Sequence, residues 1–357
     1  MDLYKHYNEI ETASLKGLRI CLDDIQILID RLDSSVFKTN IVGYSEGLAS
    51  IYTIKFGNGA IKVLMWTQMH GDESTSTKSI FDIFTFVTSD RFTDVNSFLL
   101  QNLTIYVVPI LNPDGAANYT RENGKNFDLN RDAKSLIYKE SQVLSKLIKL
   151  INPDYAFNLH DQTSYYNVAA TENVATISLL APSVDTNDSI PISRQKAMAV
   201  ISDINKELQK FIPNHIGRYD DTFCENCFGD TIQALGIPTI LIEFGYFPND
   251  EFREETRKLH TIAILKALQS IAGGNLSDYK DYFNIPLNEK RFYDKKIENV
   301  LYNGKITNLG LRYKYTLRNN QMIKIIDETE TIEGDSLKNM LFHEIFDAKG
   351  DEFNKCC

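Results

Sequence analysis

Residues 61–87 of this chain read IKVLMWTQMHGDESTSTKSIFDIFTFV. The first six residues are apolar except for one lysine, which is typical of a buried β-strand. The stretch from Ser74 to Val87 repeats apolar side chains at helical spacing and predicts an α-helix. A polar turn, His70-Gly-Asp-Glu73, separates the two. A strand, a polar turn and a helix in this order are the repeating unit of α/β folds.

The same alternation continues along the chain. Further strands are predicted at residues 51–56, 103–111, 155–159 and 239–242, and further helices at 134–151, 193–211 and 251–271. Gly57-Asn58-Gly59 lies between two predicted strands and indicates a hairpin. The first forty residues carry apolar positions typical of one amphipathic helix. These elements predict an α/β fold with a mixed, largely parallel central sheet and helices on both faces.

The composition changes after Gly273-Gly274-Asn275, which ends the last predicted helix. Beyond it, residues 311–317 and 322–326 alternate apolar and polar side chains in the manner of strands. We therefore predict a main domain over residues 1–275, whose residues 1–40 form a helical lead-in. Residues 276–357 are predicted to form a small β-rich C-terminal appendage.

Charge and hydropathy exclude several classes of function. The net charge is −10, and no run of basic residues offers a binding surface for nucleic acid or an anionic membrane. No stretch approaches the length of apolar sequence that spans a bilayer, and the N-terminus is too charged for a signal peptide. We expect a cytoplasmic protein. Its oligomeric state is left open.

Five cysteines are present, and two of them, Cys224 and Cys227, form a single C-x-x-C pair. A structural zinc site normally needs four ligands, and no second pair accompanies this one. An odd count of cysteines also does not favour a disulfide framework. We expect these thiols to be reduced and without a functional role.

Polar residues fall where predicted strands end. His70 and Asn112 follow two of these strands, and His160 and Glu243 follow two others. Because an open α/β sheet binds its ligands beyond the carboxyl ends of its strands, these side chains are expected to meet at one edge.

His70 and Glu73 are candidate metal ligands. A catalytic zinc site uses three His or carboxylate ligands and leaves one position open for water. The alternative is that Glu73 and its neighbours only cap the following helix, with His70 in the loop. His160 changes this balance, because it supplies a third ligand at the same sheet edge.

Glu243 is the candidate general base, since zinc hydrolysis needs a carboxylate that takes a proton from water and passes it to the leaving nitrogen. The alternative is a carboxylate held in a salt bridge. Arg121, Asn130 and Arg131 form a polar set that suits a substrate carboxylate and a developing oxyanion, although residues 128–132 could equally be a charged loop.

In order and spacing, these motifs resemble the zinc carboxypeptidase family, the carboxypeptidase A-like metallocarboxypeptidases, whose relatives include succinylglutamate desuccinylase and aspartoacylase. The resemblance covers roughly residues 40–270. The motifs that carry it are Gly43–Gly47, His70 with Glu73, Asn112–Gly115, Arg121–Asn123, Asp128–Arg131, His160 and Glu243.

The resemblance implies a catalytic domain with one Zn²⁺ bound by His70, Glu73 and His160. It also implies that Glu243 acts as general base and that Arg121 polarises the scissile carbonyl.

The resemblance further implies that Asn130 and Arg131 grip the C-terminal carboxylate of the substrate. The family usually has a mobile tyrosine in a flexible loop before the base; this sequence departs from the family there, and Tyr219 is the candidate stand-in. The specificity residue should lie near residues 228–230, where Asp230 would favour a cationic side chain and Phe228 an apolar one.

The expected function is that of a zinc metallocarboxypeptidase, which hydrolyses the C-terminal peptide bond with metal-activated water. The main alternative is a zinc-dependent deacylase or amidase that acts on N-acyl amino acids or peptidoglycan peptides. A non-catalytic zinc- and peptide-binding homologue is a third possibility, and the presence of Glu243 argues against it.

Overall fold

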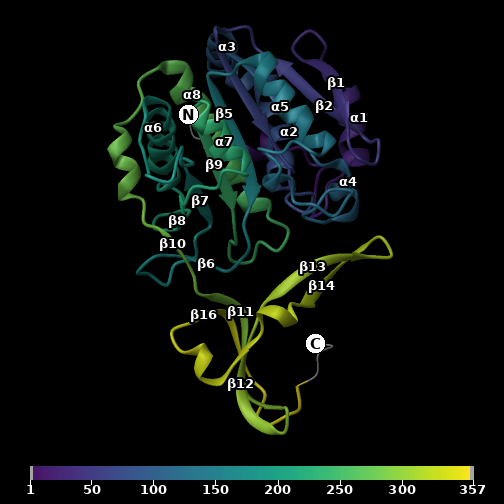
Figure 1. Cartoon of the computed structure of the whole chain (residues 1–357), viewed down its shortest axis with the longest axis vertical. Helices are drawn as coiled ribbons and strands as arrows, with labels where there is room; N and C mark the ends of the chain where they lie inside the picture. The colour runs from purple at the N-terminus through teal and green to yellow at the C-terminus, as the bar shows by residue number, and fades with distance from the viewer. Residues whose placement is uncertain (1–2, 354–357) are drawn as a thin grey trace.

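The computed structural model describes residues 3–353, and the terminal Cys356 and Cys357 lie outside that range. Its main part is built on an eight-stranded mixed sheet (Figure 1). The strands in spatial order are β1 (Lys38–Tyr44), β2 (Ser50–Phe56), β4 (Leu103–Val108), β3 (Ile61–Trp66), β5 (Tyr155–Asp161), β9 (Thr239–Phe244), β7 (Ile177–Leu180) and β8 (Ile216–Arg218). The run β4-β3-β5-β9 is parallel throughout, which confirms the predicted mixed α/β sheet.

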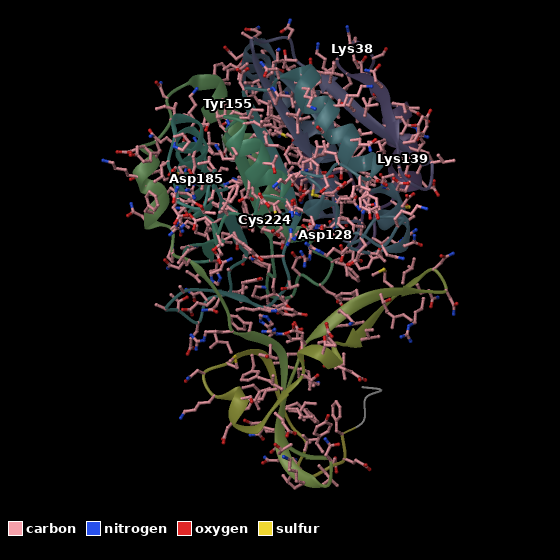
Figure 2. All side chains as sticks on the ribbon, viewed as in Figure 1. Lys38, Asp128, Lys139, Tyr155, Asp185 and Cys224 are labelled. Atoms are coloured by element: carbon pink, nitrogen blue, oxygen red, sulfur yellow. A yellow bond between two sulfur atoms is a disulfide. The ribbon has the colours of Figure 1, made fainter. Side chains whose placement is uncertain are left out.

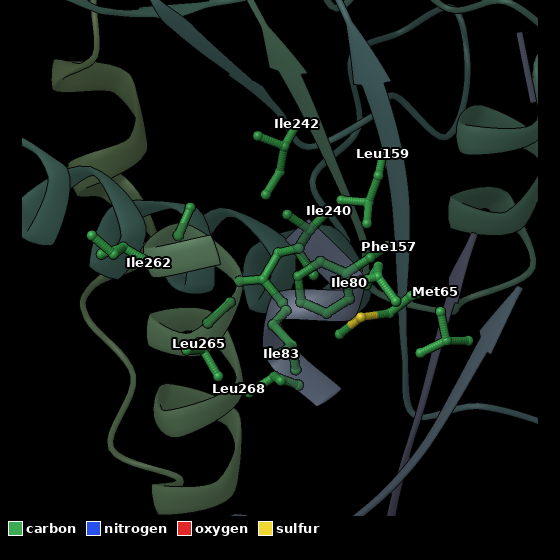
Figure 3. Packing of buried hydrophobic residues seen from close by; sticks show 14 of the residues in the cluster. Met65, Ile80, Ile83, Phe157, Leu159, Ile240, Ile242, Ile262, Leu265 and Leu268 are labelled. Carbon is green, nitrogen blue, oxygen red and sulfur yellow. The ribbon is translucent and has the colours of Figure 1, made fainter. Parts of the chain in front are cut away.

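Helices cover both faces of the sheet. One face carries α2 (Thr75–Val87), α3 (Thr93–Asn102), α6 (Ile192–Leu208) and α8 (Glu254–Gly273), and the other carries α5 (Lys139–Ile151) and α7 (Phe228–Ala234). Because successive side chains of a strand point to opposite faces, Met65 packs in one core and Trp66 in the other. Figure 3 shows Phe157 and Ile240 packed against α2 and α8.

The predicted hairpin at residues 57–59 is wrong, although both flanking strands are present. β4 lies between β2 and β3, and β2 instead forms its hairpin with β1. The backbone N–H groups of Asn58 and Gly59 donate to the carbonyls of Leu100 and Leu103, at 2.9 and 3.1 Å. A Cβ on Gly59 would lie 1.8 Å from the carbonyl carbon of Asn102. Gly59 therefore allows the loop between β2 and β3 to pass close to the start of β4, and the two strands do not form a hairpin with each other.

The predicted N-terminal helix is also wrong in its extent. Only α1 (Leu22–Asp30) is α-helical, after a short 3₁₀ turn, η1 (Tyr7–Glu9). The irregular segment between them is fixed by a buried ion pair. Asp82 accepts from the Thr12 backbone N–H at 2.7 Å, and its partner Arg257 donates to the Leu15 carbonyl at 2.7 Å. The apolar residues of this segment are thus buried without being helical.

The C-terminal part consists of two small sheets. The first has the strands β15 (Ile332–Glu333), β12 (Lys305–Leu311), β11 (Phe292–Tyr302) and β16 (Leu341–Asp347), and the second is the hairpin β13 (Tyr313–Arg318) with β14 (Gln321–Ile326). Three short 3₁₀ turns accompany them: η4 (Tyr279–Asn284), η5 (Glu328–Glu330) and η6 (Gly334–Leu337). The expected β-rich character is confirmed.

The two parts are joined by residues that pack on the main part. The side chain of Tyr282 in η4 is fully buried in the main core, and β10 (Asn288–Lys290) pairs with β6 (Tyr166–Val168). The domain boundary at residue 275 stays a prediction. Within residues 3–353, every helix is too short or too polar to cross a bilayer.

Candidate active site

Two neighbouring parallel strands, β3 and β5, deliver the candidate metal ligands. His70 follows β3, His160 lies on β5, and Glu73 begins the turn into α2. The Nδ1 atom of His70 lies 2.7 Å from Oε1 of Glu73, and the Nδ1 atom of His160 lies 2.8 Å from Oε2. The three ligand atoms lie within 4.8 Å of one another. Sequence reasoning therefore selected three side chains that the fold brings together.

A tight turn places His70 and Glu73 on the same side of the backbone. A Cβ on Gly71 would lie 1.9 Å from the carbonyl carbon of Gly115, so only glycine fits between this turn and α4 (Pro113–Asn118). Asn112 caps α4 through a 2.9 Å bond from the Gly115 N–H. Asn112 therefore lies near the candidate ligands, as predicted, but its side chain caps α4 and so supports the turn.

The donor set fits a zinc ion. Both imidazoles present Nδ1 to the carboxylate of Glu73, and the other nitrogen of His70, Nε2, lies 3.0 Å from Oδ1 of Asp128. Metal-binding histidines usually give their second nitrogen to such a carboxylate, which fixes the tautomer. Burial alone would lower the pKa of His70, but the charge of Glu73 and the hydrogen bond to Asp128 raise it to about 9. Zinc would replace the proton that these carboxylates attract.

Arg121 reaches the same centre. Its Nε and Nη2 atoms donate to Oδ2 of Asp128 at 3.1 and 3.0 Å, and its Nη1 lies 3.5 Å from Oε1 of Glu73. Asp128 therefore holds Arg121 on one oxygen and His70 on the other. Burial opposes the ionisation of Asp128, but His70 and Arg121 together hold its pKa well below the usual range. The motif that contains Asp128 was recognised in the sequence, but this supporting role was not.

Glu243 lies beside the metal ligands on the adjacent strand. The register of β5 and β9 pairs it with His160. Its pKa is raised well above the ordinary value by burial and by the negative charge of Glu73. A carboxylate with a raised pKa accepts a proton more readily than an ordinary one, as a general base requires.

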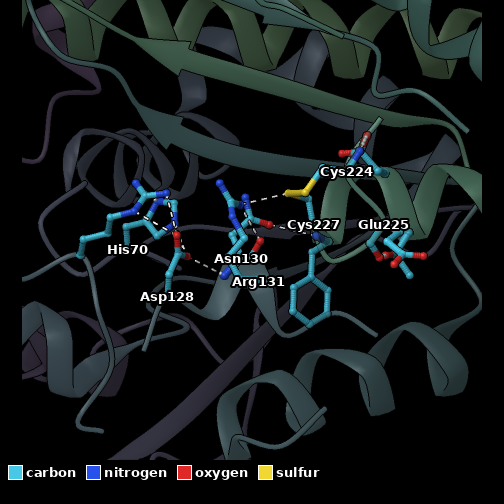
Figure 4. Close-up of a disulfide and its surroundings, with 11 residues drawn as sticks. His70, Asp128, Asn130, Arg131, Cys224, Glu225 and Cys227 are labelled. Atoms are coloured by element: carbon cyan, nitrogen blue, oxygen red, sulfur yellow. Dashed lines mark hydrogen bonds and ion pairs between the residues drawn. A yellow bond between two sulfur atoms is a disulfide. The ribbon is translucent and has the colours of Figure 1, made fainter. Parts of the chain in front are cut away.

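Asn130 and Arg131 lie further along the cavity (Figure 4). The side-chain oxygen of Asn130 accepts from the N–H of Phe228 at 2.9 Å, at the start of α7. Arg131 donates from Nη1 to the Asn130 carbonyl at 2.8 Å and to Sγ of Cys227 at 3.0 Å. Both residues are therefore held by the segment that leads into α7.

Cys224 and Cys227 form a disulfide, and the expectation of reduced thiols is wrong. The turn before α7 brings their Cα atoms to 5.4 Å, within the range that a disulfide bridges. Spacing alone did not indicate this, because the sequence does not give the orientation of the two Cβ atoms. The cytoplasmic location stays a prediction. Figure 2 shows Cys224 and Asp128 in the half of the main part that lies toward the C-terminal part.

Tyr219 and Asp230 both line the cavity. The hydroxyl groups of Tyr219 and Tyr166 lie 2.8 Å apart, and burial, with the nearby charge of Glu243, raises the pKa of Tyr219. Asp230 accepts from the Cys224 N–H at 3.2 Å, and burial raises its pKa to about 6. Phe228, the other candidate for specificity, packs instead in the core beneath α7.

One cavity of about 1270 Å³ joins these groups. Its lining includes the three candidate metal ligands together with Arg121, Asn130, Arg131, Tyr219, Asp230 and Glu243, but not Phe228. It also includes Asn158, which sequence reasoning missed and whose fully buried amide has no hydrogen-bond partner among the described residues. Its position two residues before His160 on the same strand is the signal that could have identified it, since alternate residues share a face.

Comparisons with known proteins agree with the motifs. Residues 27–164 match the zinc carboxypeptidase family. Carboxypeptidase 2 of Trichophyton rubrum is 28% identical over 105 residues, which cover 29% of this chain and only 19% of that relative. The resemblance inferred from the motifs is confirmed.

Solved structures share the fold. A metallo-carboxypeptidase from Burkholderia cenocepacia superposes with a TM-score of 0.55 at 17% identity, over 70% of this chain and 68% of that chain. Carboxypeptidase A from Helicoverpa armigera gives a TM-score of 0.55 at 13% identity, over 77% of this chain and 80% of that chain. At these identities the likeness concerns the fold.

Proposed function

We propose that this chain, a relative of the zinc carboxypeptidases over residues 27–164, is a zinc-dependent metallocarboxypeptidase that removes the C-terminal residue of a peptide. The observation that carries the proposal is the convergence of His70, Glu73 and His160 within 4.8 Å. Arg121 and Glu243 line the same cavity beside these ligands. When bound there, zinc would supply Lewis acidity that polarises a carbonyl and acidifies a water molecule.

Glu243 would accept a proton from the attacking water at its carboxylate and return it to the leaving nitrogen. Its place opposite His160 supports this role, because it puts the carboxylate next to the metal ligands and inside the cavity. Arg121 would stabilise the developing oxyanion. Asp128 holds the guanidinium group of Arg121 through Nε and Nη2, which leaves Nη1 directed toward Glu73 and the other candidate metal ligands.

Asn130 and Arg131 would bind the free carboxylate of the substrate. The Asn130 oxygen is occupied by the Phe228 N–H, so its amide NH₂ is the group that can donate to an anion. Arg131 uses Nη1 for two contacts, and within the described residues its other N–H groups have no acceptor. An amide and a guanidinium side by side suit a carboxylate.

The test compares matched peptides with a free or an amidated C-terminus, using the zinc-loaded protein and its Glu243→Gln variant. We expect release of the last residue from the free peptide only, and no turnover by the variant although it still binds zinc. Equal cleavage of both peptides would overturn the role of Asn130 and Arg131. Hydrolysis of N-acyl amino acids alone would favour a deacylase, and binding without cleavage would favour a non-catalytic protein.

A further inference from the structure

The cavity that holds the candidate metal ligands is walled on one side by the C-terminal part of the chain. Residues of that part line the same cavity as His70 and Glu243, among them Asp294, Tyr313 and Tyr315. In Figure 1 the hairpin of β13 and β14 extends beneath the loops at the lower end of the main part. The appendage therefore contributes directly to the space that a substrate would enter.

The wall is docked on the loop that follows β5, the strand that carries His160. Ser164 donates from Oγ to Asp294 at 2.7 Å, and its carbonyl lies 2.9 Å from Nε2 of His343. The Phe292 N–H donates to the carbonyl of Tyr165 at 2.9 Å. The position of the wall is thus tied to the strand that delivers a metal ligand.

Buried aromatic and cationic groups pack into this joint. The ring of His343 stacks between Tyr246 and Phe292, at centroid distances of 4.0 and 4.5 Å. Arg312 is buried, its guanidinium lies 4.2 Å from the ring centre of Tyr165, and it donates to the Phe292 carbonyl at 3.0 and 3.1 Å. A buried cation is tolerated only where such partners are fixed, so the joint differs from a flexible linker.

The hairpin also contacts the main part at a second place. The hydroxyl of Tyr315 donates to Oε1 of Glu251 at 2.8 Å, in the loop before α8. That loop also carries Arg253, which lines the cavity and donates to the carbonyls of Phe244 and Gln162. Tyr315 therefore bridges the two parts of the chain at the cavity.

We propose that the C-terminal part is a substrate-selecting wall, with Tyr315 as the contact for the residues that precede the scissile bond, and that it restricts the enzyme to short peptides. The inference rests on the proposed carboxypeptidase function. The cavity volume of about 1270 Å³ lies slightly above the ~300–1,000 Å³ typical of small-molecule sites, which suits a few residues. An extended peptide advances about 3.3–3.6 Å per residue, and the bridge from Tyr315 to Glu251 lies in the lining of the cavity that each added residue must cross.

The experiment uses the full-length zinc-loaded protein and a ladder of peptides of increasing length that share the same C-terminal residues. The variants are Tyr315→Ala, which removes the contact, and Tyr315→Trp, which enlarges it. The matched control is Phe346→Ala, an exposed aromatic residue of the same part that does not line the cavity. Thermal melting checks that each variant is folded. The readouts are kcat/KM along the ladder and, in a Glu243→Gln background, the Kd of each uncleaved peptide.

We expect the wild type to prefer short over long peptides. Tyr315→Ala should reduce that preference about two- to tenfold, which is the range expected for the loss of one aromatic contact. Tyr315→Trp should increase the preference. Phe346→Ala should leave it unchanged. If the wild type cleaved all lengths equally, or if Tyr315→Ala kept the preference for short peptides, the proposed selection by the C-terminal part would be wrong. The carboxypeptidase proposal would remain intact. Length-dependent binding without any cleavage would support the wall and remove the proposed activity.

Discussion

Removing the carboxylate of Asp128 should disable the site although this residue is not itself a candidate metal ligand. Its Oδ1 atom lies 3.0 Å from Nε2 of His70 and accepts from the Asn130 N–H at 2.8 Å, while Oδ2 accepts twice from Arg121. One carboxylate therefore orients a metal ligand, the candidate oxyanion donor and a candidate substrate-binding residue.

The size of the effect follows from these contacts. Loss of a carboxylate that orients a metal-binding histidine typically costs about 10–100-fold in metal affinity or activity. Loss of one oxyanion donor costs about 10²–10³-fold in kcat. Because effects within one network do not add, we expect Asp128→Ala to lower kcat/KM by about 10²–10³-fold and zinc affinity by about 10–100-fold. Asp128→Asn, which keeps one acceptor oxygen, should lie between the wild type and Asp128→Ala.

The assay combines kcat/KM on a short peptide with zinc affinity measured by competition against a chromophoric chelator. Asp94→Asn, an exposed carboxylate on α3 remote from the cavity lining, is the control and should leave both values unchanged. If Asp128→Ala kept both values within about twofold of the wild type, the reasoning that this residue positions His70 and Arg121 would be refuted.

Three further perturbations have expected outcomes. In the metal-free protein, the pKa of Glu243 is raised in the folded state, whereas in the unfolded state this carboxyl ionises at about pH 4.3. The free energy of unfolding therefore falls as the pH rises above that value. Glu243→Gln should therefore raise Tm at pH 7 and have little effect near pH 4, and an equal effect at both values would contradict the shift. Replacing both Cys224 and Cys227 with serine should raise KM for free-carboxylate peptides more than it lowers kcat, which steady-state kinetics of the wild type and the variant on the same peptide would measure. Asp82→Ala removes the fully buried carboxylate partner of Arg257 and leaves it with the partly exposed Glu254 at 3.1 Å and the more distant Glu11. The substitution should cost about 3–5 kcal/mol in urea unfolding; a loss below about 1 kcal/mol would show that the pair is dispensable.

The sheet could be predicted from residues 61–87 and their counterparts because the information there is local. Each strand-turn-helix unit is determined by a run of apolar strand residues, a polar turn and an apolar helical face that lie next to one another in the sequence. Parallel strands expose their carboxyl ends at a common edge, so His160 and Glu243 could be expected beside His70 before any contact was known.

Other features depend on non-local contacts that the pattern does not contain. The insertion of β4 between β2 and β3 is a pairing between distant segments, and Gly59 suits either a hairpin or a close crossing. Apolar residues before α1 indicated a helix, but the buried Arg257 holds that segment in an irregular path. That residues of β11, β13 and β16 line the cavity became visible only from the structure, in which Ser164 and Tyr315 join the two parts of the chain.

The central claim is that His70, Glu73 and His160 bind one metal ion, and a crystal of the zinc-loaded protein measured by anomalous scattering at the zinc edge tests it most directly. The account predicts a single strong zinc peak, with Nδ1 of both histidines at about 2.0–2.1 Å and a Glu73 oxygen at about 2.0–2.2 Å. A zinc peak elsewhere, or no peak between these three side chains at saturating zinc, would contradict it.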